Sequence, residues 1–169
     1  YALEVTTSGV STIARFFNDG NDDARQGLQV QCGADDGSGA TSYLTGLDGD
    51  GGAVGYLENS SGTFQVTDAS DERLKKNIVD TTINGIDTVN SMKVRDFTWK
   101  KNDTDVIGGF VAQELKDSFA PAVTDNPNRF NDNLGYSPMG VSRERLVPVL
   151  VKAIQELSAK VEELEAKLK

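Results

Sequence analysis

The amino-acid composition changes abruptly at residue 70, and this change argues against one uniform domain. Residues 1–69 contain no lysine and no proline, whereas all ten lysines and all four prolines follow them. The first stretch also holds twelve of the seventeen glycines, and its ten acidic residues against two arginines give a formal charge of −8. A chain of 169 residues has room for one ordinary domain or two small ones. We therefore expect two segments of different architecture.

The first segment has the pattern of short β-strands between glycine-rich turns. The strands are predicted at residues 1–6, 12–17, 27–31, 41–45, 53–58 and 63–67. Their large apolar side chains are too few to form the core of a free-standing sandwich. Such a segment becomes stable when copies wind around one another and bury apolar faces between chains. We expect the end of a fibrous stalk of interwound β-structure that begins upstream of Tyr1.

The second segment mixes helices and strands. A short helix is predicted over residues 71–78, with Ser70 as its N-cap and Asp71 and Glu72 in the favourable first turn. Further helices are predicted at residues 83–92 and 112–118, and strands at 93–100 and 106–111. Residues 126–140 are rich in Asn, Pro and Gly and are predicted as a loop. The order of these elements indicates an α+β domain.

From residue 142 to the end the chain has the pattern of one long helix, and Pro148 is expected either to lie in its first turns or to kink it. Apolar residues repeat every seven positions over three heptads, which is typical of a parallel coiled coil. The a positions are Val147, Ile154, Val161 and Leu168, and the d positions are Leu150, Leu157 and Leu164. The alternative is an amphipathic helix packed on its own domain, which suits residues 146–157. Beyond residue 158 the helix is mostly polar outside this seam, so we expect self-association there.

Several function classes are excluded by composition. The chain carries a net charge of −9 and has no cluster of basic residues of the kind that nucleic-acid binding needs. Its apolar runs are also much shorter than a membrane span. The absence of histidine removes Ser-His and Cys-His catalysis, and Cys32 cannot form an internal disulfide. The acidic turn at residues 48–52 is not a calcium loop, because its twelfth position is Asn59 rather than Glu. We expect no metal and no cofactor.

Ser70 and Lys75 are the candidate catalytic residues. A serine hydroxyl becomes a nucleophile when a base takes its proton, and a neutral lysine is such a base in Ser-Lys variants of the serine triad. Arg73 and Lys76 place positive charge beside Lys75, which favours the neutral amine. In the structural alternative, Ser70 only caps a helix and Lys75 is solvated. Residues five apart on one α-helix differ by about 140°, so Lys75 has to fold back or come from another chain.

Three motifs in order carry a resemblance to a known family: residues 70–78 (SDERLKKNI), residues 108–115 (GGFVAQEL) and residues 145–157 (RLVPVLVKAIQEL). Residues 70–169 resemble the intramolecular chaperone auto-processing domain, the S74 peptidase family. This domain occurs at the C-termini of bacteriophage tail fibres, tailspikes and neck appendages, and in the myelin regulatory factor. The resemblance covers the second segment and says little about residues 1–69 beyond placing them at the end of a fibre.

The resemblance implies a homotrimeric chaperone that guides folding of its own upstream stalk and then releases itself by cutting the chain once. Ser70 then matches the nucleophile and Lys75 the lysine of the dyad, while Asp71 and Arg73 match motif positions without an assigned role. The implied domains are a trimeric stalk end at residues 1–70 and the chaperone domain at residues 71–169. The implied place is the virion, after assembly in the host cytoplasm.

The bond that breaks follows from ring size and from the resemblance. Attack by Ser70 on the Ala69 carbonyl passes through a five-membered ring, whereas attack on its own carbonyl needs a strained four-membered ring. The phage members are described as cut after the serine, which predicts the Ser70–Asp71 bond, with Ala69–Ser70 as the alternative. A non-cleaving trimeric fibre tip is the competing function. A hydrolase of external substrates lacks a histidine and a nucleophile elbow.

Overall fold

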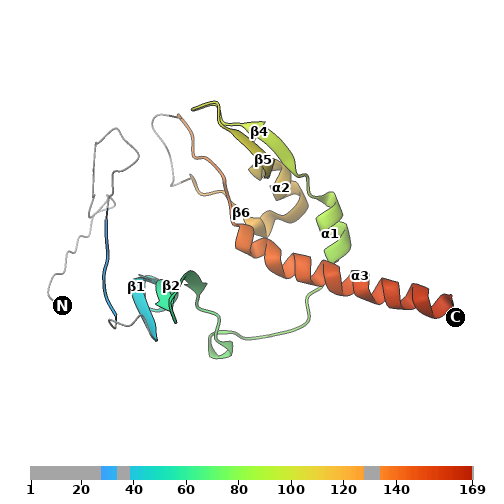
Figure 1. Ribbon diagram of the computed structural model, residues 1–169, viewed down its shortest axis with the longest axis horizontal. Coiled ribbons are helices and arrows are strands. Elements are labelled where there is room, and N and C mark those ends of the chain that lie inside the picture. Colours follow the sequence, from blue (N-terminus) through green and yellow to red (C-terminus); the bar gives the residue numbers. More distant parts are fainter. Residues whose placement is uncertain (1–27, 34–38, 128–133, 169) are drawn as a thin grey trace. The chain divides into compact units, whose positions relative to one another are not determined.

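The computed structural model describes residues 28–33, 39–127 and 134–168 and divides into two compact units, Tyr1–Ile78 and Val79–Lys169 (Figure 1). The strands expected at residues 1–6 and 12–17 lie outside the described residues. The strand expected at residues 27–31 is wrong for its described part, since residues 28–31 are in no strand. Within the described part of the chain, the first strand is β1, Ala40–Leu47.

The first unit is built on a three-stranded antiparallel sheet in the order β1-β2-β3. Its strands are β1 Ala40–Leu47, β2 Ala53–Ser60 and β3 Thr63–Asp68, which confirms the predicted strands at residues 41–45, 53–58 and 63–67. The β2–β3 turn consists of Ser61 and Gly62, both at positive φ. Such turns match the twist of hairpin strands.

The turn between β1 and β2 is held by Asp48. Its carboxylate accepts hydrogen bonds from the backbone N–H of Asp50 over 3.0 Å and of Gly52 over 2.8 Å. An aspartate that binds the backbone a few residues onward is a common turn-forming device. These contacts agree with the interpretation of the sequence as a glycine turn rather than a calcium loop.

Three large apolar side chains of this sheet share one face without being buried. The register places Leu44 opposite Leu57 and Leu57 opposite Val66, so the three share a face across all three strands. Leu44 is 66% exposed and Val66 is 76% exposed. Among the described residues of the first unit, no hydrophobic side chain is buried. The sheet of a single chain therefore lacks a core of its own.

In its described residues, the second unit contains three α-helices and two short antiparallel strand pairs. The helices are α1 Gly85–Ser91, α2 Ala112–Phe119 and α3 Val147–Lys167. The strand pairs are β4 Arg95–Thr98 with β5 Asp105–Gly109, and β6 Val123–Thr124 with β7 Gly140–Val141. The mixed α and β architecture is confirmed, and Pro148 lies in the first turn of α3, the first of the two expectations. The β6–β7 pair was not predicted.

The core of the second unit is small. It consists of Leu115 from α2, Ala122 from the 3-10 helix Ala120–Ala122, and Leu146, which precedes α3. Partly buried apolar side chains pack around these three residues: Met92, Phe110, Phe119, Val123 and Val141. Within the described chain, only one further hydrophobic residue is buried, Val149 on α3.

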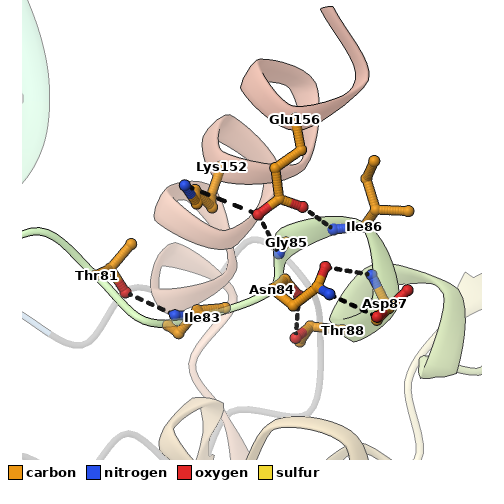
Figure 2. Close-up of polar contacts among 9 residues, drawn as sticks. All are labelled: Thr81, Ile83, Asn84, Gly85, Ile86, Asp87, Thr88, Lys152 and Glu156. Atoms are coloured by element: carbon orange, nitrogen blue, oxygen red, sulfur yellow. Dashed lines mark hydrogen bonds and ion pairs between the residues drawn. The ribbon is translucent and has the colours of Figure 1, made fainter. Parts of the chain in front are cut away.

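Helix α1 packs end-on against α3 through an unusually close backbone approach (Figure 1). A Cβ atom on Gly85 would lie 2.3 Å from the backbone N of Ala153 and 2.6 Å from the carbonyl carbon of Lys152. Only glycine fits such an approach. Figure 2 shows Glu156 reaching from α3 to the first turn of α1, where its carboxylate accepts the N–H groups of Gly85 over 3.0 Å and Ile86 over 2.9 Å.

Glu156 therefore caps a helix that lies about 70 residues earlier in the chain. Asn84 completes the cap, since its side chain accepts the N–H of Asp87 over 3.3 Å. Lys152 lies 3.8 Å from the Glu156 carboxylate on the same face of α3.

The Gly85 contact predicts that Gly85→Ala destabilises the second unit. Alanine is the better helix former by about 1 kcal/mol, but the added methyl group overlaps the α3 backbone, and overpacking costs about 1–3 kcal/mol. Urea unfolding of the full chain measures the difference. Gly140→Ala is the matched control, because its Cβ would meet only Thr124 at 3.9 Å. A Gly85→Ala chain as stable as the wild type would contradict the close packing.

The Glu156 cap predicts a pH-dependent contact. The backbone N–H groups of Ile86 and Gly85 lower the pKa of Glu156 below its ordinary 4.5. A carboxylate with a depressed pKa stabilises the folded state above its ordinary pKa, and this contribution is lost as the pH falls through the depressed value. The second unit should therefore weaken below about pH 4.5, and Glu156→Gln should show a smaller acid dependence in urea unfolding. Identical pH profiles for the two proteins would refute this role.

Candidate active site

The segment around Ser70 follows β3 and turns back on itself. The N–H of Ala69 donates to the Val54 carbonyl over 3.1 Å, so strand pairing continues to the residue before Ser70. A single 3-10 turn, Glu72–Leu74, comes next, and Lys75 follows it in an extended conformation. The backbone N–H of Lys75 closes the turn by donating to the Glu72 carbonyl over 2.9 Å.

This path brings the Lys75 amine onto Ser70 of the same chain. The Nζ atom lies 2.7 Å from the Ser70 hydroxyl oxygen and 2.8 Å from the Ser70 carbonyl oxygen. A continuous α-helix would have held the two side chains on different faces. Here the chain makes one 3-10 turn with an extended residue on each side, so the Lys75 side chain can fold back onto Ser70. The sequence had left two possibilities, that the lysine folds back or that it comes from another chain, and the structure has the first. Both residues are exposed.

The predicted helix over residues 71–78 with Ser70 as N-cap is wrong. The helix has three residues, and its N-cap is Asp71, whose carboxylate accepts the N–H of Arg73 over 2.8 Å. Asn77 has a positive φ of 54°, so the chain has left helical conformation before the predicted end. The Ser70 side chain contacts Lys75 instead of the turn.

Asp71 and Arg73 form a two-pronged ion pair within the turn. Arg73 donates from Nε over 2.9 Å and from Nη2 over 2.7 Å, one bond to each carboxylate oxygen. The Arg73 guanidinium is the main cause that lowers the pKa of Asp71, followed by the Arg73 backbone N–H and the charge of Lys75. Asp71 is therefore ionised at neutral pH and bound mainly to Arg73.

The arrangement at Ser70 suits proton transfer beside a carbonyl group. A neutral amine has one lone pair and two N–H groups, whereas a protonated amine only donates. In its neutral form, Lys75 can accept the proton of the Ser70 hydroxyl while an N–H donates to the Ser70 carbonyl. Donation to a carbonyl oxygen stabilises the negative charge that develops there during attack.

The second motif, residues 108–115, runs from the end of β5 into α2 in the second unit. Gly109 leaves room for the Phe97 ring, which a Cβ atom would approach to 2.5 Å. Glu114 accepts two hydrogen bonds from Arg95, over 2.8 and 2.9 Å, and Lys93 lies 3.7 Å away. The side-chain hydrogen bond from Arg95 is the main cause that lowers the pKa of Glu114. These contacts support the fold.

The third motif, residues 145–157, divides its side chains between two faces of α3. Val149, Ala153 and Glu156 lie toward the domain, as buried or partly buried residues. The heptad positions lie elsewhere on the helix and are 46% to 87% exposed. These exposed seam residues are Val147, Leu150, Ile154, Leu157, Val161, Leu164 and Leu168. The helix packs on its own domain over residues 146–157, as the alternative interpretation required, but it does so without covering the seam.

Two features of this site had not been assigned from the sequence. The spacing of Asp71 and Arg73 is compatible with an ion pair, but sequence reasoning gave neither residue a role. The Glu156 cap on α1 had no sequence signal, because helix caps are normally local.

Within the described ranges, no group of three or more acidic or cysteine residues could hold a metal ion. No helix in those ranges has the length and apolarity of a membrane span.

Comparison with known proteins adds two findings. Residues 70–124 match the Peptidase_S74 family, described as the chaperone of endosialidase. A protein of Escherichia phage Phieco32 named "Probable tail fiber protein" is 33% identical over 116 residues, which cover 65% of this chain and 16% of that protein. The chain thus spans only a small part of the length of this relative. The family match begins at Ser70 and includes Lys75, so residues 70–124 of this chain are similar to the Peptidase_S74 family, the chaperone of endosialidase.

Proposed function

We propose that residues 71–169 are the intramolecular chaperone of a phage tail fibre. In this account the chain assembles as a homotrimer in the host cytoplasm, guides folding of the stalk that ends near residue 70, and cuts itself once at Ser70. The fibre then remains in the virion. The observation that carries the proposal is the 2.7 Å contact between the Lys75 amine and the Ser70 hydroxyl, inside the region that matches a peptidase family. The name of the similar phage protein supports the tail-fibre context.

We assign Lys75 as the general base and Ser70 as the residue that it activates. The 2.8 Å contact of the same amine with the Ser70 carbonyl favours the Ser70–Asp71 bond, because this carbonyl belongs to that bond. In this route the Ser70 hydroxyl gives its proton to the Lys75 amine and takes one from a water molecule, whose oxygen attacks the Ser70 carbonyl carbon. The protonated lysine then gives a proton to the departing Asp71 nitrogen, which leaves a carboxylate on Ser70 and a free amine on Asp71. At the alternative Ala69–Ser70 bond, the Ser70 hydroxyl attacks the Ala69 carbonyl, and water then hydrolyses the resulting ester.

The exposed seam of α3 supports self-association. Seven apolar side chains in heptad positions lie open to solvent in one chain, and burying such surface contributes roughly 25 cal/mol per Å². The pattern alone suits a dimer as well as a trimer. We propose three chains, because a stalk of interwound strands and the family both favour three.

The sheet of the first unit is the proposed client. Its apolar face, Leu44, Leu57 and Val66, needs a partner surface, and copies of the same sheet would supply one. Bringing three such segments into register is slow when contacts are distant in sequence. Early association of the three α3 helices would raise the effective concentration of the stalk ends to roughly millimolar. Cleavage would then leave the stalk held by its unfolding barrier.

A non-cleaving structural tip is the second candidate function. Its trimer would rest on the same exposed seam, but the Ser70–Lys75 contact would have no purpose in it. A denaturing gel of freshly expressed chain separates the two functions, since only the self-cutting chaperone gives two pieces.

Cleavage should depend on Ser70 and Lys75. Ser70→Ala and Lys75→Ala should leave one full-length band, because a general base contributes typically about 10²–10⁴-fold to a rate. Lys76→Ala is the matched control and should be cut at a rate close to that of the wild type, since the contact to Ser70 comes from Lys75. Time courses on denaturing gels measure these rates. A Ser70→Ala chain that is cut as fast as the wild type would exclude Ser70 as the activated residue.

Assembly should depend on the seam. Leu157→Glu places an unpaired carboxylate in each chain of the proposed interface, where burial without a partner is strongly unfavourable. This variant should be monomeric by light scattering and should also fail to cut itself. Gln155→Glu adds the same charge at an exposed position outside the seam and should remain trimeric. A monomeric Leu157→Glu chain that still cuts itself would separate cleavage from assembly.

A further inference from the structure

We propose that Arg73 is a positioning residue for self-cleavage, which binds the Asp71 carboxylate and thereby leaves the Lys75 amine free to contact Ser70. This role rests on the proposed function of Ser70 and Lys75. The role explains the ion pair between Arg73 and Asp71, which the contact between Ser70 and Lys75 does not require.

Asp71 and Ser70 are both potential acceptors for the Lys75 amine. Asp71 lies four residues before Lys75, and the charge of Lys75 acts on the Asp71 carboxylate. An ionised carboxylate is a stronger acceptor for an ammonium group than a hydroxyl or a carbonyl oxygen. Without another partner, Asp71 would be the favoured acceptor for Lys75. A lysine paired with a carboxylate stays protonated and cannot act as a base.

Arg73 occupies three of the roughly four acceptor sites of the Asp71 carboxylate. One carboxylate oxygen accepts the Arg73 backbone N–H over 2.8 Å and Nε over 2.9 Å, and the other accepts Nη2 over 2.7 Å. Lys75 meanwhile makes both of its described hydrogen bonds to Ser70. The two cations of the turn therefore have separate acceptors.

The identity of the cation at position 73 also matters. A guanidinium binds both oxygens of a carboxylate at once and stays charged at every pH where proteins fold. It therefore holds Asp71 at the high pH where a lysine becomes neutral. The other charged groups of this part of the chain are Asp68 at the end of β3, Glu72 in the turn and Lys76 beyond it. Asp68 and Glu72 are acidic, so neither can replace Arg73 as the partner of Asp71.

The test measures the rate of a single turnover against pH. The full-length chain carries a photocaged serine at position 70, so that light starts the reaction in the folded protein. Arg73→Gln releases Asp71 and should move the midpoint of the pH–rate profile upward by about 0.5 to 1 pH unit, with rates about three- to tenfold lower below the midpoint. Arg73→Lys keeps a cation and should move it less.

The decisive variant is the double substitution Arg73→Gln with Asp71→Asn. Asparagine still caps the turn but no longer attracts Lys75, so the midpoint should return to that of the wild type or below it. If Arg73→Gln instead lowers the rate by one factor at every pH, or if Asp71→Asn fails to restore the midpoint, Arg73 has only a structural role. A wild-type chain that stays intact after uncaging contradicts the proposed function itself, and the role of Arg73 falls with it.

Discussion

The shortage of buried apolar surface in a single chain is the constraint on which the rest of this structure depends. Four hydrophobic residues are buried among the described residues, all of them in the second unit. The apolar face of the β1-β2-β3 sheet and the seam of α3 both lie open to solvent. A small unit with so little core normally needs a partner. We propose that association of chains covers both exposed surfaces.

The same constraint explains why the second unit relies on polar contacts. Glu156 caps α1, and Arg95 binds Glu114 with two hydrogen bonds. Gly85 brings the two helix backbones together without adding side-chain volume. These contacts fix the inner face of α3 to its own domain. The heptad seam lies on another face of α3 and is exposed to solvent.

Much of the fold could be predicted from the sequence because its signals are local. Alternating apolar residues and glycine turns predicted β1, β2 and β3, and helical periodicity predicted α3. The details of the site could not be predicted. Asp71 rather than Ser70 caps the turn, because the Ser70 hydroxyl is bound to the Lys75 amine instead. The Glu156 cap joins residues that lie far apart in the chain. The β6–β7 pair is too short for a periodic pattern.

Native mass spectrometry of the freshly folded wild-type chain tests the central claim most directly, because one spectrum reports both cleavage and assembly. We expect a complex that contains three copies of a C-terminal piece whose first residue is Asp71. Cleavage on the other side of Ser70 would add one serine to each copy and would identify the alternative bond. A stable trimer of intact chains would contradict self-cleavage, and a cut monomer would contradict the link between assembly and chemistry.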